Sequence, residues 1–112
     1  MNRKYRVFIS QPMRGLTSDE IISTRMEFWN KNKSIFAEEL KCSVKDLLLI
    51  NTIFEPNHPV IELLGKSVEA MSRANMVVFM KNWEESRGCV IEHEVVEKYK
   101  KEFGDNFIIM YE

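Results

Sequence analysis

Four short, mainly apolar runs, separated by longer amphipathic segments, constrain the fold of this chain more than any other feature of its sequence. The runs cover residues 5–10, 46–52, 76–80 and 107–111. Each run is too short for a buried helix, and the runs are continuous rather than alternating between apolar and polar residues. Such runs are typical of strands that are buried on both faces, as in a parallel sheet with helices on each side.

The segments between these runs carry helix signals. Thr17 and Glu20 fit a capping box and predict a helix that begins there. Pro59 suits the first turn of a second helix, and Gly88 is expected to open a third helix that reaches about residue 103. The apolar positions expected on the buried face of the first helix are Ile22, Met26, Trp29, Phe36 and Leu40. Those expected for the second helix are Val60, Leu63, Leu64, Val68 and Met71.

The resulting order of elements, β-α-β-α-β-α-β, predicts an α/β fold with a parallel sheet of about four strands. Right-handed crossovers place helices on both faces of such a sheet, which gives a Rossmann-like domain of three layers. A length of 112 residues corresponds to one domain, residues 1–112. Ligands of such sheets bind outside the carboxyl ends of the strands. Three loops are expected at that edge, at residues 11–17, 53–59 and 81–88.

Composition and charge exclude several classes of function. Sixteen basic and seventeen acidic residues give a net charge of -1, which argues against a dedicated nucleic-acid binder. No apolar run approaches the roughly 18 to 20 residues that span a bilayer, and the basic N-terminus lacks the apolar core of a signal peptide. We therefore expect a cytoplasmic protein with neither a nucleic-acid nor a membrane partner. Its two cysteines, Cys42 and Cys89, are too few for a disulfide scaffold or a four-cysteine zinc site.

Glu92 occupies an unusual position in the predicted third helix. Val96, Tyr99 and Phe103 share one face of that helix with Val95 beside them, and Glu92 lies on the same stripe, in the first turn. The polar residues Glu94, Glu97, Lys98 and Lys101 fall on the opposite, solvated side. A first-turn glutamate can simply complement the helix dipole, but that role does not require an inward-facing side chain. Because burial of an unpartnered acid is costly, the position favours a functional role.

The residues just before this helix suit an anion. Ser86 offers a hydroxyl, Gly88 permits close approach of the backbone, and the amides at a helix N-terminus are free to bind phosphate or carboxylate together with Arg87. The same pattern is also an ordinary helix cap. Arg14, at the end of the first strand, is a candidate to pair with that anion, or else it is a solvated loop residue.

Other chemically active residues are less informative. His58 and His93, together with Cys89 and Glu94, fit no standard zinc pattern, and His93 is expected to point away from the Glu92 face. We therefore expect no metal site and no cofactor. Trp83 has two open interpretations, stacking on a base or sugar and covering the edge of the sheet. Cys89 could have a depressed pKa at the helix start, but no histidine is placed as its base, so a catalytic cysteine is the less favoured reading.

Three segments of the chain resemble the nucleoside 2-deoxyribosyltransferase-like superfamily, and in particular a branch of small, mostly uncharacterised bacterial and phage proteins. They are Val-Phe-Ile-Ser-Gln-Pro-Met-Arg-Gly at 7–15, Leu-Gly-Lys-Ser at 64–67 and the run from Ala-Asn-Met to Ile-Glu-His-Glu at 74–94. The resemblance implies a flavodoxin-like parallel sheet. It also implies a glutamate that attacks the anomeric carbon of a 2-deoxyribosyl group, forming a covalent intermediate that a new base or water resolves.

By this resemblance Glu92 takes the position of the nucleophile. Ser86, six residues earlier, matches the serine that binds phosphate in members that hydrolyse 2-deoxynucleoside 5-monophosphates, where transferases acting on free nucleosides carry an aspartate. The other wall of the pocket would be the loop that contains Gln11, Pro12, Met13 and Arg14. The implied partner is a small-molecule nucleoside or nucleotide, and a homo-oligomer is expected because relatives commonly complete their sites across a dimer.

Three residues depart from the superfamily pattern. Phe8 stands where a first-strand tyrosine usually orients the glutamate, Ser67 replaces an aspartate of the helix before the third strand, and Asn75 replaces the aspartate of an Ala-Asp-Val-Val pattern. Two functions are therefore carried forward from the sequence. The first is an N-glycosidic-bond hydrolase or deoxyribosyltransferase with Glu92 as nucleophile, and the alternative is a catalytically weak or inactive module that binds a nucleotide or sugar phosphate. A structural or interaction protein on an α/β scaffold is a third option.

Overall fold

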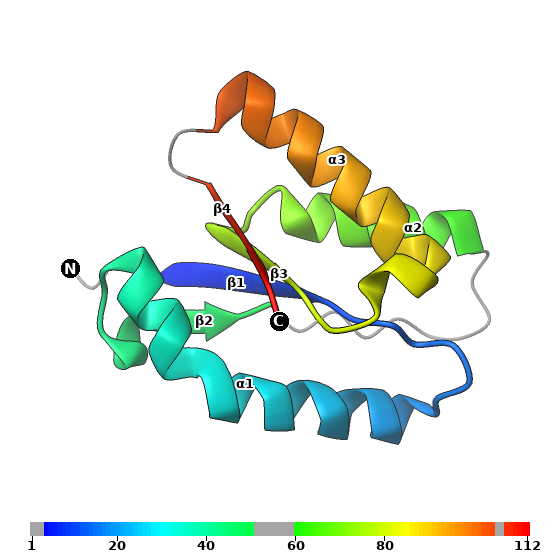
Figure 1. The fold of residues 1–112 in the computed structure, drawn as a ribbon, viewed down its shortest axis with the longest axis horizontal. Coiled ribbons are helices and arrows are strands. Elements are labelled where there is room, and N and C mark those ends of the chain that lie inside the picture. The colour runs from blue at the N-terminus through cyan, green and yellow to red at the C-terminus, as the bar shows by residue number, and fades with distance from the viewer. Residues whose placement is uncertain (1–3, 51–59, 105–106) are drawn as a thin grey trace.

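The sheet contains four parallel strands in the order β2-β1-β3-β4 (Figure 1). The computed structural model describes residues 4–50, 60–104 and 107–112. The strands are β1 (Tyr5–Ser10), β2 (Leu47–Leu49), β3 (Met76–Phe79) and β4 (Ile108–Tyr111). The predicted α/β fold with a parallel sheet of about four strands is confirmed.

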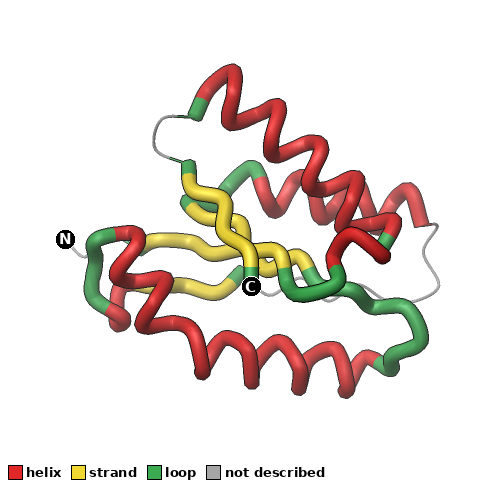
Figure 2. The backbone as a smooth tube through the Cα atoms, in the orientation of Figure 1, coloured by secondary structure: helices red, strands yellow, loops and turns green. Residues whose placement is uncertain are grey.

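Three helices cover the two faces of this sheet (Figure 2). They are α1 (Ser18–Leu40), α2 (Val60–Met71) and α3 (Arg87–Phe103), with short 3-10 turns at η1 (Val44–Asp46) and η2 (Trp83–Glu85). One face packs against α1, whereas α2 and α3 lie together on the other face (Figure 1). In the described part of the chain, no helix is both long and apolar enough to cross a membrane.

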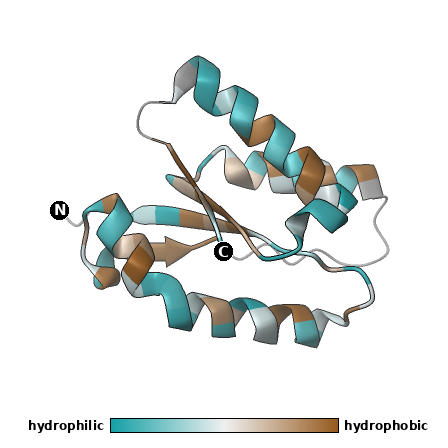
Figure 3. Ribbon diagram, in the orientation of Figure 1, coloured by the Kyte–Doolittle hydropathy of each residue, from teal (hydrophilic) through white to brown (hydrophobic). Residues whose placement is uncertain are grey.

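Successive side chains of each strand point to opposite faces of the sheet, and both faces are buried, which explains why the runs are continuously apolar. In β1, Val7 and Ile9 belong to the core that contains α1, whereas Phe8 belongs to the core beneath α2 and α3. In β3, Val78 and Val77 divide between the two cores in the same way. Because successive side chains of a strand point to opposite faces, both faces need apolar residues when helices cover both. The helices, by contrast, carry mixed hydrophilic and hydrophobic residues along their length (Figure 3).

The start of α1 is as predicted, but its buried face is different. The Thr17 hydroxyl accepts a hydrogen bond from the backbone N–H of Glu20, whose carboxylate in turn accepts from the N–H of Thr17. Ile22 and Met26, expected in the core, are 37% and 38% exposed, and Arg25 is buried instead. With 23 residues α1 is about 34 Å long, whereas a six-residue strand spans about 20 Å. The N-terminal turns of α1 therefore extend past the carboxyl end of β1, where Ile22 and Met26 remain more than a third exposed.

The remaining predicted segments agree with the structure where it describes them. Met71 is buried, and Leu63, Leu64 and Val68 are partly buried, as expected for the inner face of α2. The predicted loop at 53–59, with its turn at 56–59, lies outside the described residues.

Candidate active site

The helix α3 directs Glu92 into the protein, as its position on the apolar stripe predicted. The residue is 8% exposed, and Val96, one turn later, is 2% exposed. Val95 and Tyr99 are 36% and 43% exposed, so the buried stripe is narrower than expected. Since α3 begins at Arg87, Glu92 is the sixth residue of the helix rather than a first-turn residue. The helix dipole acts mainly within the first turn, so complementing that dipole does not account for this acid.

The closest partner of Glu92 is Ser10, the last residue of β1. The Ser10 hydroxyl donates a hydrogen bond of 2.6 Å to Oε1 of Glu92, and both side chains are buried. Burial raises the pKa of Glu92 above its ordinary value, because desolvation disfavours the charged form. Hydrogen bonds from Ser10 and from Ser67 of α2, and the charge of Arg25 on α1, act in the opposite direction. The carboxylate thus receives stabilising interactions from three separate elements.

Arg25 lies at the same edge of the sheet, on the side of α1. Its side chain is 1% exposed, and its Nε donates to Oε1 of Gln11 at 3.0 Å. Gln11 is itself 4% exposed, and its Nε2 donates to the carbonyl of Ile21 at 3.1 Å. Burial lowers the pKa of Arg25, while the negative charge of Glu92 raises it. The side chain of Gln11, predicted to line a ligand pocket, hydrogen-bonds Arg25 and the backbone of α1.

A cleft of about 1120 Å³ lies between the loop that follows β1 and the beginning of α3. Its lining residues are Pro12, Met13, Arg14, Asn82, Glu84, Glu85, Ser86, Arg87, Gly88, Val90 and Ile91. The structure therefore brings together two of the three loops expected at the carboxyl edge. Six predicted binding residues, Pro12, Met13, Arg14, Ser86, Arg87 and Gly88, line this one cleft. Glu92 is not among the lining residues, although it directly follows the lining residue Ile91 in α3.

Ser86 is the N-cap of α3. Its Oγ accepts a hydrogen bond of 3.4 Å from the backbone N–H of Cys89. The capping interpretation is therefore correct. The N-terminus of α3 opens into the same cleft through Arg87 and Gly88.

Cys89 does not have the depressed pKa that its position at a helix start suggested. Its side chain is 1% exposed, and burial raises the pKa of the thiol. Interactions with the hydroxyls of Ser10 and Ser86 oppose this rise, and the charge of Glu92 adds to it. The thiol is therefore held neutral, because the nearest charge is negative and the surroundings exclude water.

The amino-acid sequence matches one protein-family model over most of its length. Residues 5–104 match the model described as Domain of unknown function (DUF4406). The chain belongs to this family. A search of curated proteins and a search of solved structures found no match. The DUF4406 region runs from β1 to the end of α3, so it contains both Glu92 and the cleft, whereas β4 lies beyond it.

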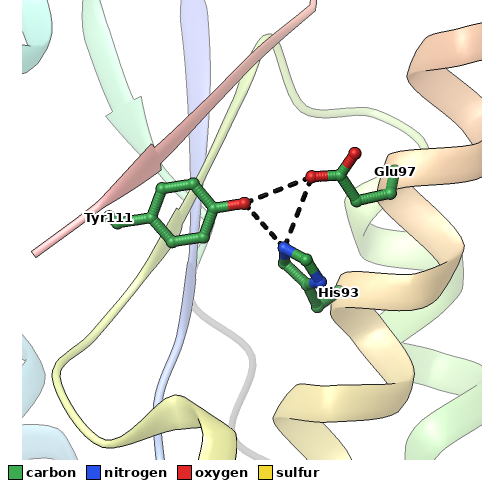
Figure 4. A network of polar contacts seen from close by, with 3 residues as sticks. All are labelled: His93, Glu97 and Tyr111. Carbon is green, nitrogen blue, oxygen red and sulfur yellow. Dashed lines mark hydrogen bonds and ion pairs between the residues drawn. The ribbon is translucent and has the colours of Figure 1, made fainter.

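Within this DUF4406 domain, Trp83 belongs to an aromatic cluster beside β4. Its ring centroid lies 4.2 Å from that of His93 and 5.3 Å from that of Phe79. Nε2 of His93 is 2.6 Å from Oη of Tyr111, which also donates to Glu97 at 3.2 Å (Figure 4). Trp83 therefore packs at the edge of the sheet, which is one of its two interpretations. His93 faces this cluster rather than Ser10 and Glu92.

Asn75 and Phe8, which differ from the pattern of the superfamily that the sequence resembles, make contacts within the fold. Asn75 lies at the amino end of β3, where its Oδ1 accepts from the backbone N–H of Arg6 at 2.8 Å. It is therefore at the opposite edge of the sheet from Glu92. Phe8 is 2% exposed and packs in the core with Met71 and Val77.

Sequence reasoning missed Ser10 and Arg25 and gave no role to Ser67. Ser10 ends an otherwise apolar run at the carboxyl edge, and this position was the available signal. Arg25 gave no signal, because an arginine in an amphipathic helix is usually solvated. Across the described residues, no three histidine, cysteine or acidic side chains are grouped to hold a metal ion, and His58 lies outside those residues.

Proposed function

We propose that this DUF4406 domain cleaves or exchanges the N-glycosidic bond of a nucleotide or deoxynucleoside, with Glu92 as the nucleophile. The observation that carries the proposal is a buried carboxylate beside a cleft, held at 2.6 Å by the hydroxyl of Ser10 at the carboxyl edge of a parallel sheet. A buried acid that served only stability would be better replaced by an apolar residue, because desolvation of a charge costs several kcal/mol. Retention of such a group is typical of a reactive site.

The resemblance to the nucleoside 2-deoxyribosyltransferase-like superfamily supports this reaction. In that superfamily a glutamate at the position of Glu92 attacks the sugar. Ser86 has the spacing of the phosphate-binding serine, and the structure directs it into the cleft together with Arg14. The assignment of this domain to the superfamily is part of the proposal, as is a homo-oligomeric state.

The proposed reaction has two steps. In the first, an oxygen of the Glu92 carboxylate forms a bond to the anomeric carbon, and the bond from that carbon to the base breaks. The bonding electron pair leaves on the base nitrogen, which takes a proton from water. In the second step, water or another base attacks the same carbon, and the glycosyl ester breaks to release the Glu92 carboxylate. Because each step inverts the anomeric carbon, the overall configuration is retained.

The charges of the cleft favour a ligand with one phosphate group. Arg14, Arg87 and the Ser86 hydroxyl are suited to a 5′-phosphate at the N-terminus of α3. Glu84 and Glu85 line the same cleft, and they disfavour additional phosphate groups through like-charge repulsion. A nucleoside monophosphate therefore fits the cleft better than a triphosphate does.

The experiment is a thermal-shift screen of nucleosides, nucleoside monophosphates and sugar phosphates, with chromatographic detection of released base in the same samples. A ligand that binds the folded state raises the melting temperature once its concentration greatly exceeds Kd. We expect a shift together with released base for the wild type, and a shift without release for Glu92→Gln. Base release by Glu92→Gln at the wild-type rate would remove Glu92 from the mechanism.

A binding module without turnover is the second candidate. It is favoured by the low exposure of Glu92, 8%, and by the absence of this residue from the lining of the cleft. For this function, a nucleotide would stabilise the wild type and Glu92→Gln equally, and neither protein would release base.

A further inference from the structure

Ser10 stands out among the residues of β1. Tyr5 begins the strand partly exposed, whereas the last four residues are nearly inaccessible, and of those four only Ser10 is polar. Its carbonyl accepts from the backbone N–H of Met80 at 3.0 Å, and the residue pairs with Phe79 across the sheet. The Cα of Ser10 is therefore fixed by the central strands of the sheet.

Alternation along β1 gives the direction of this side chain. Ser10 shares a face with Phe8, which packs in the core beneath α2 and α3. This is the face on which α3 carries Glu92, and the hydroxyl of Ser10 donates to Oε1 of that residue at 2.6 Å. The distance is in the short range of hydrogen bonds between a hydroxyl and a charged carboxylate.

Cys89 lies one turn before Glu92 on α3, and its thiol interacts with the same hydroxyl. Ser10 has a single proton to donate, and the 2.6 Å contact places that proton on Oε1 of Glu92.

We propose that Ser10 is a positioning residue for Glu92, which fixes the orientation of the attacking carboxylate by holding Oε1. This role rests on the proposed function. Of the interactions that stabilise the charge of Glu92, the hydrogen bond from Ser10 is the largest, ahead of those from Ser67 and Arg25. Removal of the hydroxyl leaves Oε1 buried with one donor fewer and raises the pKa of Glu92 further.

The test compares Ser10→Ala with Ser34→Ala, which removes the same group from an exposed position on α1. The first readout is the titration of the Glu92 carboxyl carbon by NMR, identified by its loss in Glu92→Gln. We expect the titration midpoint of Glu92 to move to higher pH in Ser10→Ala and to stay unchanged in Ser34→Ala. The second readout is base release, for which kcat should fall about tenfold or more in Ser10→Ala with KM within about twofold. The acidic limb of its pH profile should move to higher pH.

A further variant, Ser10→Cys, controls for a folding defect in Ser10→Ala. Ser10→Cys keeps a weak donor at a similar size, and its midpoint should lie between those of the wild type and Ser10→Ala. An unchanged Glu92 midpoint in either folded variant would overturn the proposal. Unchanged kcat and pH profile in Ser10→Ala would also overturn it and would leave the proposed function intact. If the wild type releases no base from any nucleoside or nucleotide, the proposed function fails and the positioning role of Ser10 fails with it, whatever the titration shows.

Discussion

Adjacent residues of α3 lie in opposite environments. Glu92 is 8% exposed, and its partners Ser10, Ser67 and Arg25 come from three other elements of the fold. It is largely surrounded by protein. The polar groups around it must therefore compensate the loss of hydration.

His93, the next residue, has a side chain that is 20% exposed and belongs to the cluster at β4 (Figure 4). Its Nε2 lies 3.4 Å from Oε1 of Glu97, whose side chain is 52% exposed, and Tyr111 is 48% exposed. Water competes for each of these contacts. Exposed polar pairs of this kind contribute about 0 to 1 kcal/mol to stability.

The two environments predict different effects of substitution on reactivity and on stability. A hydrogen bond to a buried charge contributes about 1.5 to 3 kcal/mol, and loss of one partner leaves the charge without compensation. Substitutions around Glu92 should therefore change reactivity strongly, whereas those around His93 should change stability slightly.

The largest expected effect comes from Glu92→Asp. The shorter side chain moves the carboxylate by about one methylene away from Ser10 and from the sugar, and a displacement of about 1 Å can cost about 100-fold in rate. We expect base release to fall about 100-fold or more, measured by chromatography under saturating substrate. His93→Ala is the matched variant one residue along the helix, and its rate should stay within about threefold. An equal fall in the rate of base release in the two variants would contradict the difference between the two environments.

Ser86→Ala should have the next largest effect. Loss of the hydroxyl removes a donor to the proposed 5′-phosphate, which should raise KM for a monophosphate about tenfold relative to the free nucleoside. It also removes the cap of α3, at a cost of about 1 kcal/mol in urea unfolding. Thr17→Ala removes the cap of α1 at a similar cost and should leave both KM values unchanged. A parallel rise of both KM values in Ser86→Ala would contradict the phosphate role.

Glu92→Gln should change how stability depends on pH. Burial raises the pKa of Glu92 above 4.5 in the folded state, so the folded protein holds this proton more tightly than the unfolded chain does. Its contribution to stability is then present below pH 4.5 and is lost as pH rises through the raised value. We expect Glu92→Gln to gain stability relative to the wild type as pH rises from 4 to 8, measured as a rise in its Tm relative to that of the wild type. Parallel stability curves for the two proteins from pH 4 to 8 would show that the acid is not desolvated.

Tyr111→Phe should have the smallest effect. The ring is retained against Phe79 and Trp83, and only the exposed contacts of the hydroxyl to His93 and Glu97 are lost. We expect a loss of about 0.5 kcal/mol in urea unfolding and no change in base release. A loss above about 2 kcal/mol would mean that this cluster supports the fold as strongly as the buried one does.

The sequence predicted the fold and the inward position of Glu92, because both depend on local periodicity. The buried face of α1 was predicted wrongly at Ile22 and Met26. Apolar residues were assigned to the core there, although the structure buries Arg25 through a hydrogen bond to Gln11, on a different element.

Local sequence patterns could not identify the hydrogen-bond partner of Glu92. Ser10 is 82 positions away from Glu92 in the sequence. Only the parallel pairing of β1 with β3 and the packing of α3 over both bring the two side chains together. A single polar residue at the end of an apolar strand indicates a site, but it does not identify its partner.

The central claim, that Glu92 attacks the sugar, is tested most directly by trapping the intermediate. The wild type and Glu92→Gln are incubated with a 2′-fluoro-substituted 2′-deoxynucleoside 5′-monophosphate, whose fluorine slows release of the glycosyl enzyme, and are then analysed by intact-protein and peptide mass spectrometry. The account predicts one added fluorodeoxyribosyl phosphate on the wild-type peptide that contains Glu92, and none on the variant. Base release by the wild type with an adduct on another residue, or unchanged release by Glu92→Gln, would contradict it.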